Sequence, residues 1–368
     1  MTNFLNSVFL ITSTIIGLGV FILPYTLAKS GIYYWFWFLI VPVLIFFVHL
    51  VYSEIIFQIE EKHNLPGLSA RILGRNWKNF VWFIDFLGNI LVFASYYIAL
   101  YKFTIVIFPF NNPLLIKLFY AFLVILIILP SVNFLSDIEG ILGFFMILIF
   151  GGLSIYFLPY LNLSNFKIEV LNPWLSYGVL IFAYTGYSSL QMVYDIIGKN
   201  KKTMFWINLI SIFLVFCIYF LFTVSIYGAF GKDVSVMVIE NIKNLPSKFI
   251  VLAVAFLAIF NIFTTFIALA FYLKRGLIFD YKINSILAWF IISLTIIVIP
   301  FLKLENIAKL ISLTGSIFLG FNLFVLLLCY LNLKNYLYFK IPRFLVIILS
   351  LILALGWIIG ILSEYMGG

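Results

Sequence analysis

Long apolar segments separated by short polar stretches make up most of this chain. Eleven of the segments have the length that a helix needs to cross a bilayer. Their predicted ranges are 5–28, 34–57, 79–108, 114–135, 138–160, 174–198, 204–229, 248–274, 284–301, 305–333 and 343–363. No proline- or serine-rich linker and no block of charge divides them. The pattern therefore predicts an all-α integral membrane protein with one transmembrane domain over residues 1–368.

Two of these segments are interrupted near their middle. In the first, Gly17, Gly19 and Pro24 break the apolar helix, and in the sixth the break is the stretch Phe-Ala-Tyr-Thr-Gly-Tyr-Ser-Ser at 182–189. Backbone that leaves a helix at membrane depth must be buried in protein or line a cavity. Interrupted helices at matching positions of two halves are a sequence indication of a transporter binding site.

The positions of the breaks also predict the domain plan. Each break lies in the first span of a five-span unit, so the second unit enters the membrane from the opposite side. We therefore predict a 5+5 inverted repeat with broken first and sixth helices. Its parts are residues 1–160, residues 174–333 and one additional helix at 343–363.

Composition and charge place the chain in a membrane. Hydrophobic residues make up 65% of it, charged residues only 10%, and the mean hydropathy is +1.20, which excludes a soluble globular domain. If the N-terminus is cytoplasmic, thirteen of the 22 basic residues, including every arginine, fall in inner loops and eight in outer loops. This bias predicts a multi-pass protein of the cell membrane with the N-terminus cytoplasmic and the C-terminus outside.

The same distribution of charge and polar residues excludes other classes of protein. The net charge of +9 is spread over the loops, whereas a nucleic-acid partner requires a clustered basic face. Cys217 and Cys329 fall inside apolar segments, and we expect buried thiols there. The sequence contains no metal-ligand cluster, no nucleophile–base pair and no phosphate-binding loop, so we do not expect an enzyme.

The two breaks suit one kind of ligand. The N-terminus of a half-helix points backbone N–H groups and a positive dipole end at a carboxylate. Unwound carbonyls and the C-terminus of a half-helix suit an ammonium group or a small cation. An α-amino acid carries both groups a few ångströms apart. Two broken helices side by side could therefore hold this zwitterion without any charged side chain.

Several motifs resemble one transporter family. The stretches Gly17–Tyr25 and Gly178–Ser189 resemble the first and sixth spans of the amino acid/auxin permease family, which belongs to the amino acid–polyamine–cation superfamily. The further matches are Lys29-Ser30-Gly31, Tyr52-Ser53-Glu54, Leu65-Pro66-Gly67, Leu73-Gly74, Gly198-Lys-Asn-Lys-Lys and Leu313–Ile317. The resemblance covers most of the chain and implies eleven spans and amino acid transport.

The resemblance also implies the substrate site. It assigns the substrate carboxylate to the N–H groups of Leu18 and Gly19, and the amine to the carbonyls of Ile15, Phe182 and Thr185. The Phe182 side chain would close over the substrate. Gly17 and Gly186 would permit the sharp backbone of the two breaks.

The coupling ion remains open between Na⁺ and H⁺, and we expect no other cofactor. In sodium-coupled members of the superfamily, a cation lies between the first and eighth spans. The residues at matching positions here are Ser13, Ile16 and Asn261 through their carbonyls, and Thr264 and Thr265 through their hydroxyls. Alternatively, the paired threonines bond back to their own helix. A proton-coupled transporter would instead use an intramembrane ionisable residue, and the candidates are His49, Glu54 and Asp85.

These observations predict a secondary active transporter that moves an amino acid by alternating access. Because the sequence shows no obvious buried charge at the breaks, we expect a neutral amino acid. The alternative is a non-transporting amino acid receptor on the same fold, similar to the membrane subunit of spore germinant receptors. The expected partners are the amino acid and the lipid bilayer, with no obligate protein partner and no nucleic acid.

Overall fold

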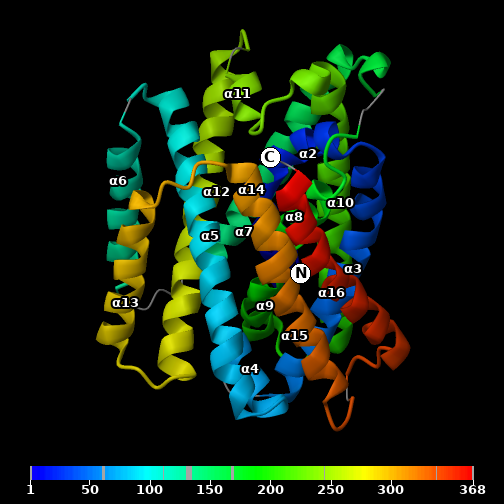
Figure 1. Cartoon of the computed structure of the whole chain (residues 1–368), viewed down its shortest axis with the longest axis vertical. Coiled ribbons are helices and arrows are strands. Elements are labelled where there is room, and N and C mark those ends of the chain that lie inside the picture. The colour runs from blue at the N-terminus through cyan, green and yellow to red at the C-terminus, as the bar shows by residue number, and fades with distance from the viewer. Residues whose placement is uncertain are drawn as a thin grey trace.

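The computed structural model describes residues 2–59, 63–110, 112–129, 135–166, 170–243, 245–336 and 338–366. Within these ranges the regular structure is helical, and no strand occurs. Figure 1 shows the helices running along the long axis of the molecule, with short helices at the two ends. The apolar segments fold in this way because, in lipid, a helix satisfies its own backbone hydrogen bonds.

The helices are listed here in chain order. They are α1 (Thr2–Ile15), η1 (Leu18–Ile22), α2 (Leu23–Ser30), α3 (Ile32–Gln58), α4 (Leu65–Ile72), α5 (Arg75–Ile107), α6 (Pro113–Ile127), α7 (Leu135–Phe157), η2 (Leu158–Tyr160), η3 (Leu163–Phe166), α8 (Leu175–Tyr184), η4 (Tyr187–Ser189), α9 (Leu190–Ile197), α10 (Lys201–Phe230), η5 (Gly231–Asp233), α11 (Ile239–Ile242), α12 (Lys248–Phe279), α13 (Ser285–Val298), η6 (Ile299–Phe301), α14 (Ile307–Leu313), the π-helical turn η7 (Thr314–Leu319), α15 (Gly320–Leu331) and α16 (Arg343–Met366).

The eleven predicted spans each coincide with a helix or with a broken pair of helices. In the described part of the chain, seven helical segments are long and apolar enough to cross a membrane. The segments 3–15 and 18–30 form an eighth span bent by 45°, and α6 and α13 are shorter apolar helices. The remaining predicted span is the pair α8 and α9, interrupted by η4. The predicted all-α fold with broken first and sixth helices is confirmed, although the predicted end of the fourth span at 135 is wrong, because Leu135 begins α7.

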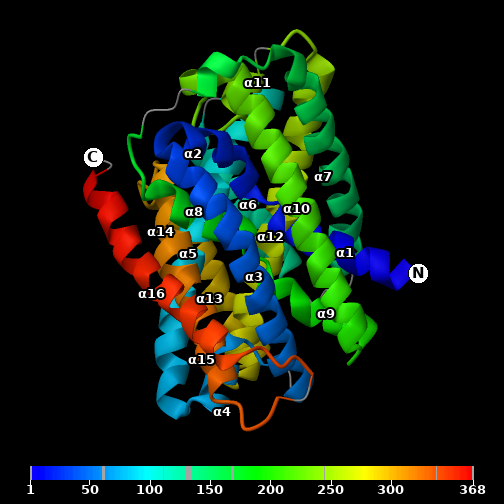
Figure 2. The same cartoon turned by 90° about the vertical axis from the view of Figure 1, so that its right-hand side faces the viewer.

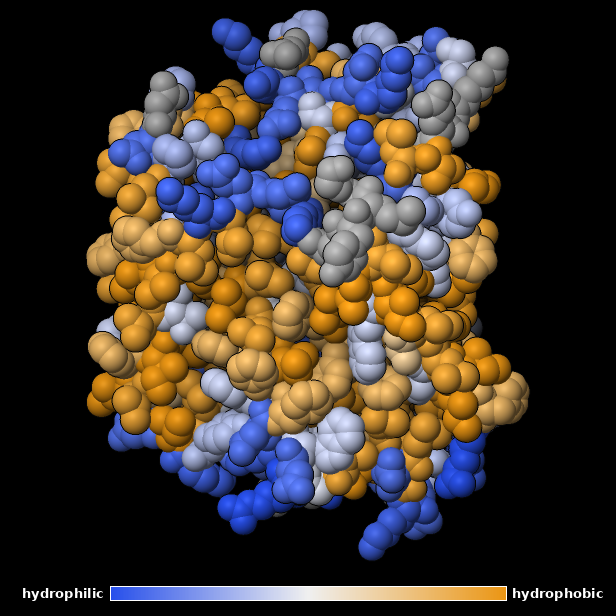
Figure 3. All heavy atoms as spheres, in the orientation of Figure 1, coloured by the Kyte–Doolittle hydropathy of each residue, from blue (hydrophilic) through white to orange (hydrophobic). Residues whose placement is uncertain are grey.

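The surface matches a membrane environment. Figure 3 shows a broad apolar band around the middle of the molecule and hydrophilic residues at its two ends. Large apolar side chains are exposed on the surface of the bundle, and Ile286 on α13 is 72% exposed. In water such a surface would drive aggregation, whereas lipid tails solvate it. The chain is therefore a multi-pass membrane protein.

Helix burial separates central from peripheral spans. The most apolar parts of α3 and of the segment 307–331 are 72% buried, whereas that of α16 is 33% buried. The additional helix α16 packs beside α15 at the edge of the bundle (Figure 2). Its Gly356 lies so close to Tyr177 of α8 that a Cβ would be 2.0 Å from the Tyr177 hydroxyl. Small residues of this kind let membrane helices approach closely.

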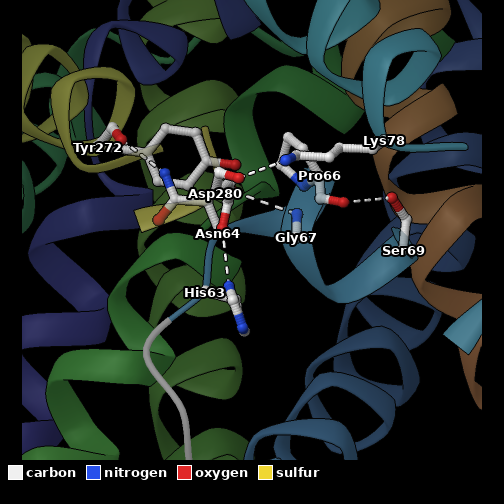
Figure 4. A network of polar contacts seen from close by, with 8 residues as sticks. All are labelled: His63, Asn64, Pro66, Gly67, Ser69, Lys78, Tyr272 and Asp280. Atoms are coloured by element: carbon white, nitrogen blue, oxygen red, sulfur yellow. Dashed lines mark hydrogen bonds and ion pairs between the residues drawn. The ribbon is translucent and has the colours of Figure 1, made fainter. Parts of the chain in front are cut away.

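The loops predicted to be cytoplasmic meet at one end of the molecule. Asp280, which follows α12, accepts hydrogen bonds from Nδ1 of His63 at 2.9 Å and from the Gly67 N–H at 3.2 Å, and its carbonyl accepts one from Lys78 (Figure 4). Burial raises the pKa of the Asp280 carboxyl, and the hydrogen bond with His63 opposes this effect. These contacts join α4 to the end of α12.

A second set of contacts at this end joins the remaining predicted inner loops. Glu54 accepts hydrogen bonds from the N–H groups of Tyr338 and Phe339, which follow α15. The Lys201 ammonium lies 5.7 Å from the centre of the Phe339 ring. The predicted inner loops therefore make up the face at one end of the molecule (Figure 1). Lys62 and Gly368, which also entered the topology prediction, lie outside the described residues.

We predict that this face is cytoplasmic. In a background with Cys217 and Cys329 replaced by serine, Lys201→Cys should react with a membrane-impermeant maleimide only after the membrane is opened. Lys232→Cys, in η5 near the opposite end, should react in intact cells. The opposite labelling pattern would show that the protein is inserted the other way round.

Candidate functional site

The two breaks in the membrane helices have the same construction. Helix α1 ends at Ile15 and η1 begins at Leu18, while α8 ends at Tyr184 and η4 begins at Tyr187. Each break is therefore two residues long, and in each the second residue is a glycine. The half-helices α2 and α8 lie in the upper part of Figure 2, and α1 and α9 lie lower. The two breaks thus meet near mid-height, which is the arrangement that an inverted repeat produces.

The glycines of the breaks serve close packing. A Cβ on Gly19 would be 2.7 Å from Cα of Ala183 in α8, and a Cβ on Gly186 would be 2.5 Å from the side chain of Ile15 in α1. Each broken helix therefore touches the other through a residue without a side chain. Gly17 and Gly186 have φ values of −101° and −143°, so neither uses the left-handed region that favours glycine. That these two glycines permit the sharp backbone of the breaks stays a prediction.

One buried tyrosine holds the two breaks together. The hydroxyl of Tyr219 on α10 lies 2.9 Å from the carbonyl oxygen of Ile15 and 3.0 Å from that of Ala183, and its single proton is shared between them. Both carbonyls lie at the ends of half-helices, where no helical N–H group reaches them. The side chain of Tyr219 has no exposed surface. It thus replaces the missing hydrogen-bond donors in a place that water cannot supply.

A cavity of about 80 Å³ lies between the breaks. Since a water needs roughly 10–15 Å³ on this scale, the cavity has room for a small group of atoms. Its lining includes most of the predicted substrate-binding residues, namely Ile15, Gly17, Leu18, Gly19, Phe182 and Thr185. Gly186 lies behind this wall, against Ile15. The structure thus brings the predicted residues together, and their contact with a substrate stays a prediction.

The opposite wall of the cavity carries a carboxyl group. It is formed by α5 and α12, with Asp85 and Asn89 from α5 and Thr265 and Tyr272 from α12. Asp85 is only 3% exposed. The expectation of a site without buried charge is therefore wrong. The sequence places Asp85 ten residues into a long helix, and nothing in the local pattern shows that this turn faces the breaks.

Asp85 is held by neutral hydrogen-bond donors. Its Oδ1 accepts a hydrogen bond of 2.7 Å from the Asn322 amide of α15 and one of 3.3 Å from the Asn89 amide. The Tyr272 hydroxyl lies beside the carboxylate but outside hydrogen-bond geometry. Among the residues that the structure describes, no lysine, arginine or histidine forms an ion pair with Asp85. A buried charge ordinarily has such a partner.

The five predicted cation ligands also lie together, at the junction of α1 and α12. The Asn261 carboxamide accepts a hydrogen bond from the Ser13 hydroxyl at 3.3 Å and donates one to the Ile16 carbonyl at 2.5 Å. The hydroxyls of Thr264 and Thr265 both donate to the Asn261 carbonyl, at 3.0 and 2.8 Å. The two threonines thus bond back to their own helix, which is the alternative to a cation site given above.

The other two candidates for proton carriage lie away from the cavity. Nδ1 of His49 on α3 is 3.0 Å from the side-chain oxygen of Asn208 on α10, and the His49 side chain is fully buried in that interface. The Glu54 carboxylate accepts the two N–H groups that follow α15. Neither residue lines the cavity.

Solved structures resemble this fold, although a scan of protein-family models and a search of curated proteins find no match. The crystal structure of MhsT in complex with L-phenylalanine has a TM-score of 0.69, covering 96% of this chain and 98% of its own at 13% identity. A mutant manganese transporter from Eremococcus coleocola has a TM-score of 0.66, covering 98% and 85% at 15% identity. The chain therefore has the inverted-repeat fold of these transporters. The narrower resemblance to the amino acid/auxin permease family stays a prediction.

We predict that the Tyr219 hydroxyl stabilises the junction of the breaks. Tyr219→Phe should lower the free energy of unfolding by about 1–3 kcal/mol, because a buried carbonyl loses its donor. The matched control is Tyr184→Phe, since the Tyr184 ring packs 5.1 Å from that of Tyr219 and its hydroxyl has no hydrogen-bond partner among the described residues. Thermal unfolding in detergent should show a loss for Tyr219→Phe alone. An equal loss in both variants would mean that the hydroxyl bridge contributes nothing of its own.

Proposed function

We propose that this protein is a secondary transporter of an α-amino acid, working by alternating access around the cavity between the two breaks. The observation that carries this proposal is the meeting of two identically built breaks at one cavity. A ligand there contacts both halves of an inverted repeat. Rocking of one half against the other would then expose the same ligand first to one side of the membrane and then to the other.

The exposed backbone of the breaks suits a zwitterion. At the start of η1 the first N–H groups, those of Leu18 and Gly19, have no partner within the helix and can hold a carboxylate. The carbonyls of Phe182 and Thr185, at the end of α8, would hold the ammonium group, since both residues line the same cavity. The Ile15 carbonyl contributes less than expected, because it already accepts hydrogen bonds from Tyr219 and from the Gly17 N–H.

The cavity favours an amino acid over a metal ion. Of the two similar structures, one is described with L-phenylalanine and the other is a manganese transporter. Transition metals require several nitrogen, sulfur or carboxylate ligands. The described part of this chain has no group of three or more histidine, cysteine or acidic residues that could hold a metal ion. Asp85 is the acidic residue at the cavity, and its neighbours are amides and phenols.

Gly17→Ala tests the cavity as the substrate site. A Cβ on Gly17 would meet no atom within 4 Å, so the added methyl group occupies cavity space without disturbing the packing. We expect about tenfold or greater loss of affinity for a bound L-amino acid, equivalent to about 1.4 kcal/mol, and an unchanged melting temperature. Gly152→Ala on α7 is the control, because a Cβ there also meets nothing and the residue is exposed outside the site.

The assay should measure binding of radiolabelled standard L-amino acids to purified protein and their uptake into proteoliposomes. Binding together with uptake supports the proposal, and binding without uptake under any gradient supports the receptor alternative. Absence of binding by every standard L-amino acid would contradict both. Equal affinity of Gly17→Ala and the unchanged protein would place the substrate elsewhere.

A further inference from the structure

Resting on the proposed amino acid transport, we propose that the coupling ion is a proton and that it is carried by the carboxyl group of Asp85. The geometry that carries this inference is a buried carboxyl at the substrate cavity, held only by neutral groups. A carboxylate in that position lacks the positive charge that would balance it. We infer that this charge arrives from outside the protein with each amino acid.

Position selects Asp85 among the three candidates for proton carriage. A coupling proton must bind where the substrate binds, so that each stabilises the other. Asp85 lines the cavity with Gly17 and Phe182. His49 is enclosed between α3 and α10, and Glu54 is fixed by backbone N–H groups at the end of the molecule. Neither can contact an amino acid at the breaks.

The surroundings of Asp85 come from five parts of the fold. Facing the carboxyl group are Asn89 on α5, Tyr52 on α3, Tyr187 in η4, Tyr272 on α12 and Asn322 on α15. Among fixed charges, that of Asp280 at the inner end of α12 acts on Asp85, whereas that of Arg275 acts on the neighbouring Tyr52. None of the groups that face Asp85 within the described structure is therefore a cation that would hold it permanently ionised.

The neighbours can satisfy both protonation states. Burial disfavours a charged carboxylate, whereas donated hydrogen bonds favour it. Asn322 donates to Asp85 through its amide, and its side-chain oxygen is buried without a partner in the described structure. A carboxamide can turn and accept instead of donate. Once Asp85 takes up a proton, its O–H can donate to that oxygen.

The same cluster is connected to the inner end of the molecule. The Tyr272 side chain lies beside Asp85, while its backbone carbonyl accepts a hydrogen bond of 2.6 Å from Asn64 (Figure 4). Asn64 directly precedes α4, whose Gly67 binds the Asp280 carboxylate. Tyr272 therefore connects Asp85 to the contacts that join α4 to α12.

The α1–α12 junction argues against sodium. A sodium ion there needs free oxygen atoms. The Ile16 carbonyl is instead occupied by the Asn261 amide, and the Asn261 carbonyl by the two threonine hydroxyls. The N–H group of the Asn261 side chain thus occupies the Ile16 carbonyl oxygen that a cation would bind. Na⁺ at the Ile16 carbonyl would have to displace the hydrogen bond that the Asn261 amide makes there.

The resulting cycle balances charge and protons. A proton from the outer solution binds one Asp85 oxygen while the zwitterion binds at the breaks, and both leave to the inner solution after the rocking motion. Each turnover therefore carries one amino acid and one positive charge inward. At this ratio, a difference of one pH unit supports up to about tenfold accumulation when the membrane potential is clamped to zero.

The experiment uses proteoliposomes of the full chain, a mixture of radiolabelled standard L-amino acids and a pH-sensitive dye in the lumen. With an acidic exterior, the unchanged protein should concentrate label and acidify the lumen, and replacing Na⁺ by N-methylglucamine should change neither. Binding to the purified protein should tighten as the pH falls. Asp85→Asn, which resembles the protonated state, should abolish both concentration and acidification, and its binding should no longer depend on pH.

Two further variants complete the test. Asp85→Glu keeps an ionisable group and should retain pH-dependent binding even if transport is slower. Glu240→Gln, which removes a carboxylate paired with Lys102 near the opposite end, should behave as the unchanged protein. Uptake that needs Na⁺, or acidification that persists in Asp85→Asn, would overturn the proton assignment while leaving amino acid transport intact. Absence of any amino acid binding or uptake would instead reject the proposed function itself.

Discussion

Backbone that leaves a helix inside a membrane finds no water to bond with, and this constraint governs the centre of the protein. Both breaks leave carbonyl groups at the ends of half-helices. The Tyr219 hydroxyl reaches one from each break, so a single side chain on a third helix satisfies parts of both. The breaks can remain open toward the cavity because their other sides are satisfied in this way. The backbone groups that stay open to the cavity are the ones that a substrate can bind.

Several polar side chains of the interior join separate helices. Asn261 joins α12 to α1, Asn322 joins α15 to α5, and His49 joins α3 to α10. Each supplies a hydrogen bond that apolar packing cannot give, and lipid offers no competing partner. Asp85 differs from these because it retains a charge to be balanced. In the proposed cycle, it is the group that responds to the pH of the solution.

The sequence predicts the fold well because membrane helices and their breaks depend on the residues of one continuous segment. Gly17, Pro24 and Gly186 stand out within apolar segments, so the two breaks and the repeat could be found without a structure. The partners of the site could not. Asn322 is 237 positions from Asp85, and Tyr219 is one of 22 tyrosines with no local feature to distinguish it. Which face of α5 meets the breaks is decided by the packing of α5 against α12 and η7, and no single segment contains that information.

The reciprocal contacts of Gly19 with Ala183 and of Gly186 with Ile15 have a mechanical consequence. Interlocked side chains must disengage before two helices can turn against each other, and this costs packing energy at every cycle. A contact made through a glycine has no side chain to disengage on that helix. The two helices can therefore rotate against each other with little loss of packing contact. The two contacts lie beside the cavity, near the centre of the molecule. A small rotation of the helices about this point gives the largest displacement at the two ends of the molecule.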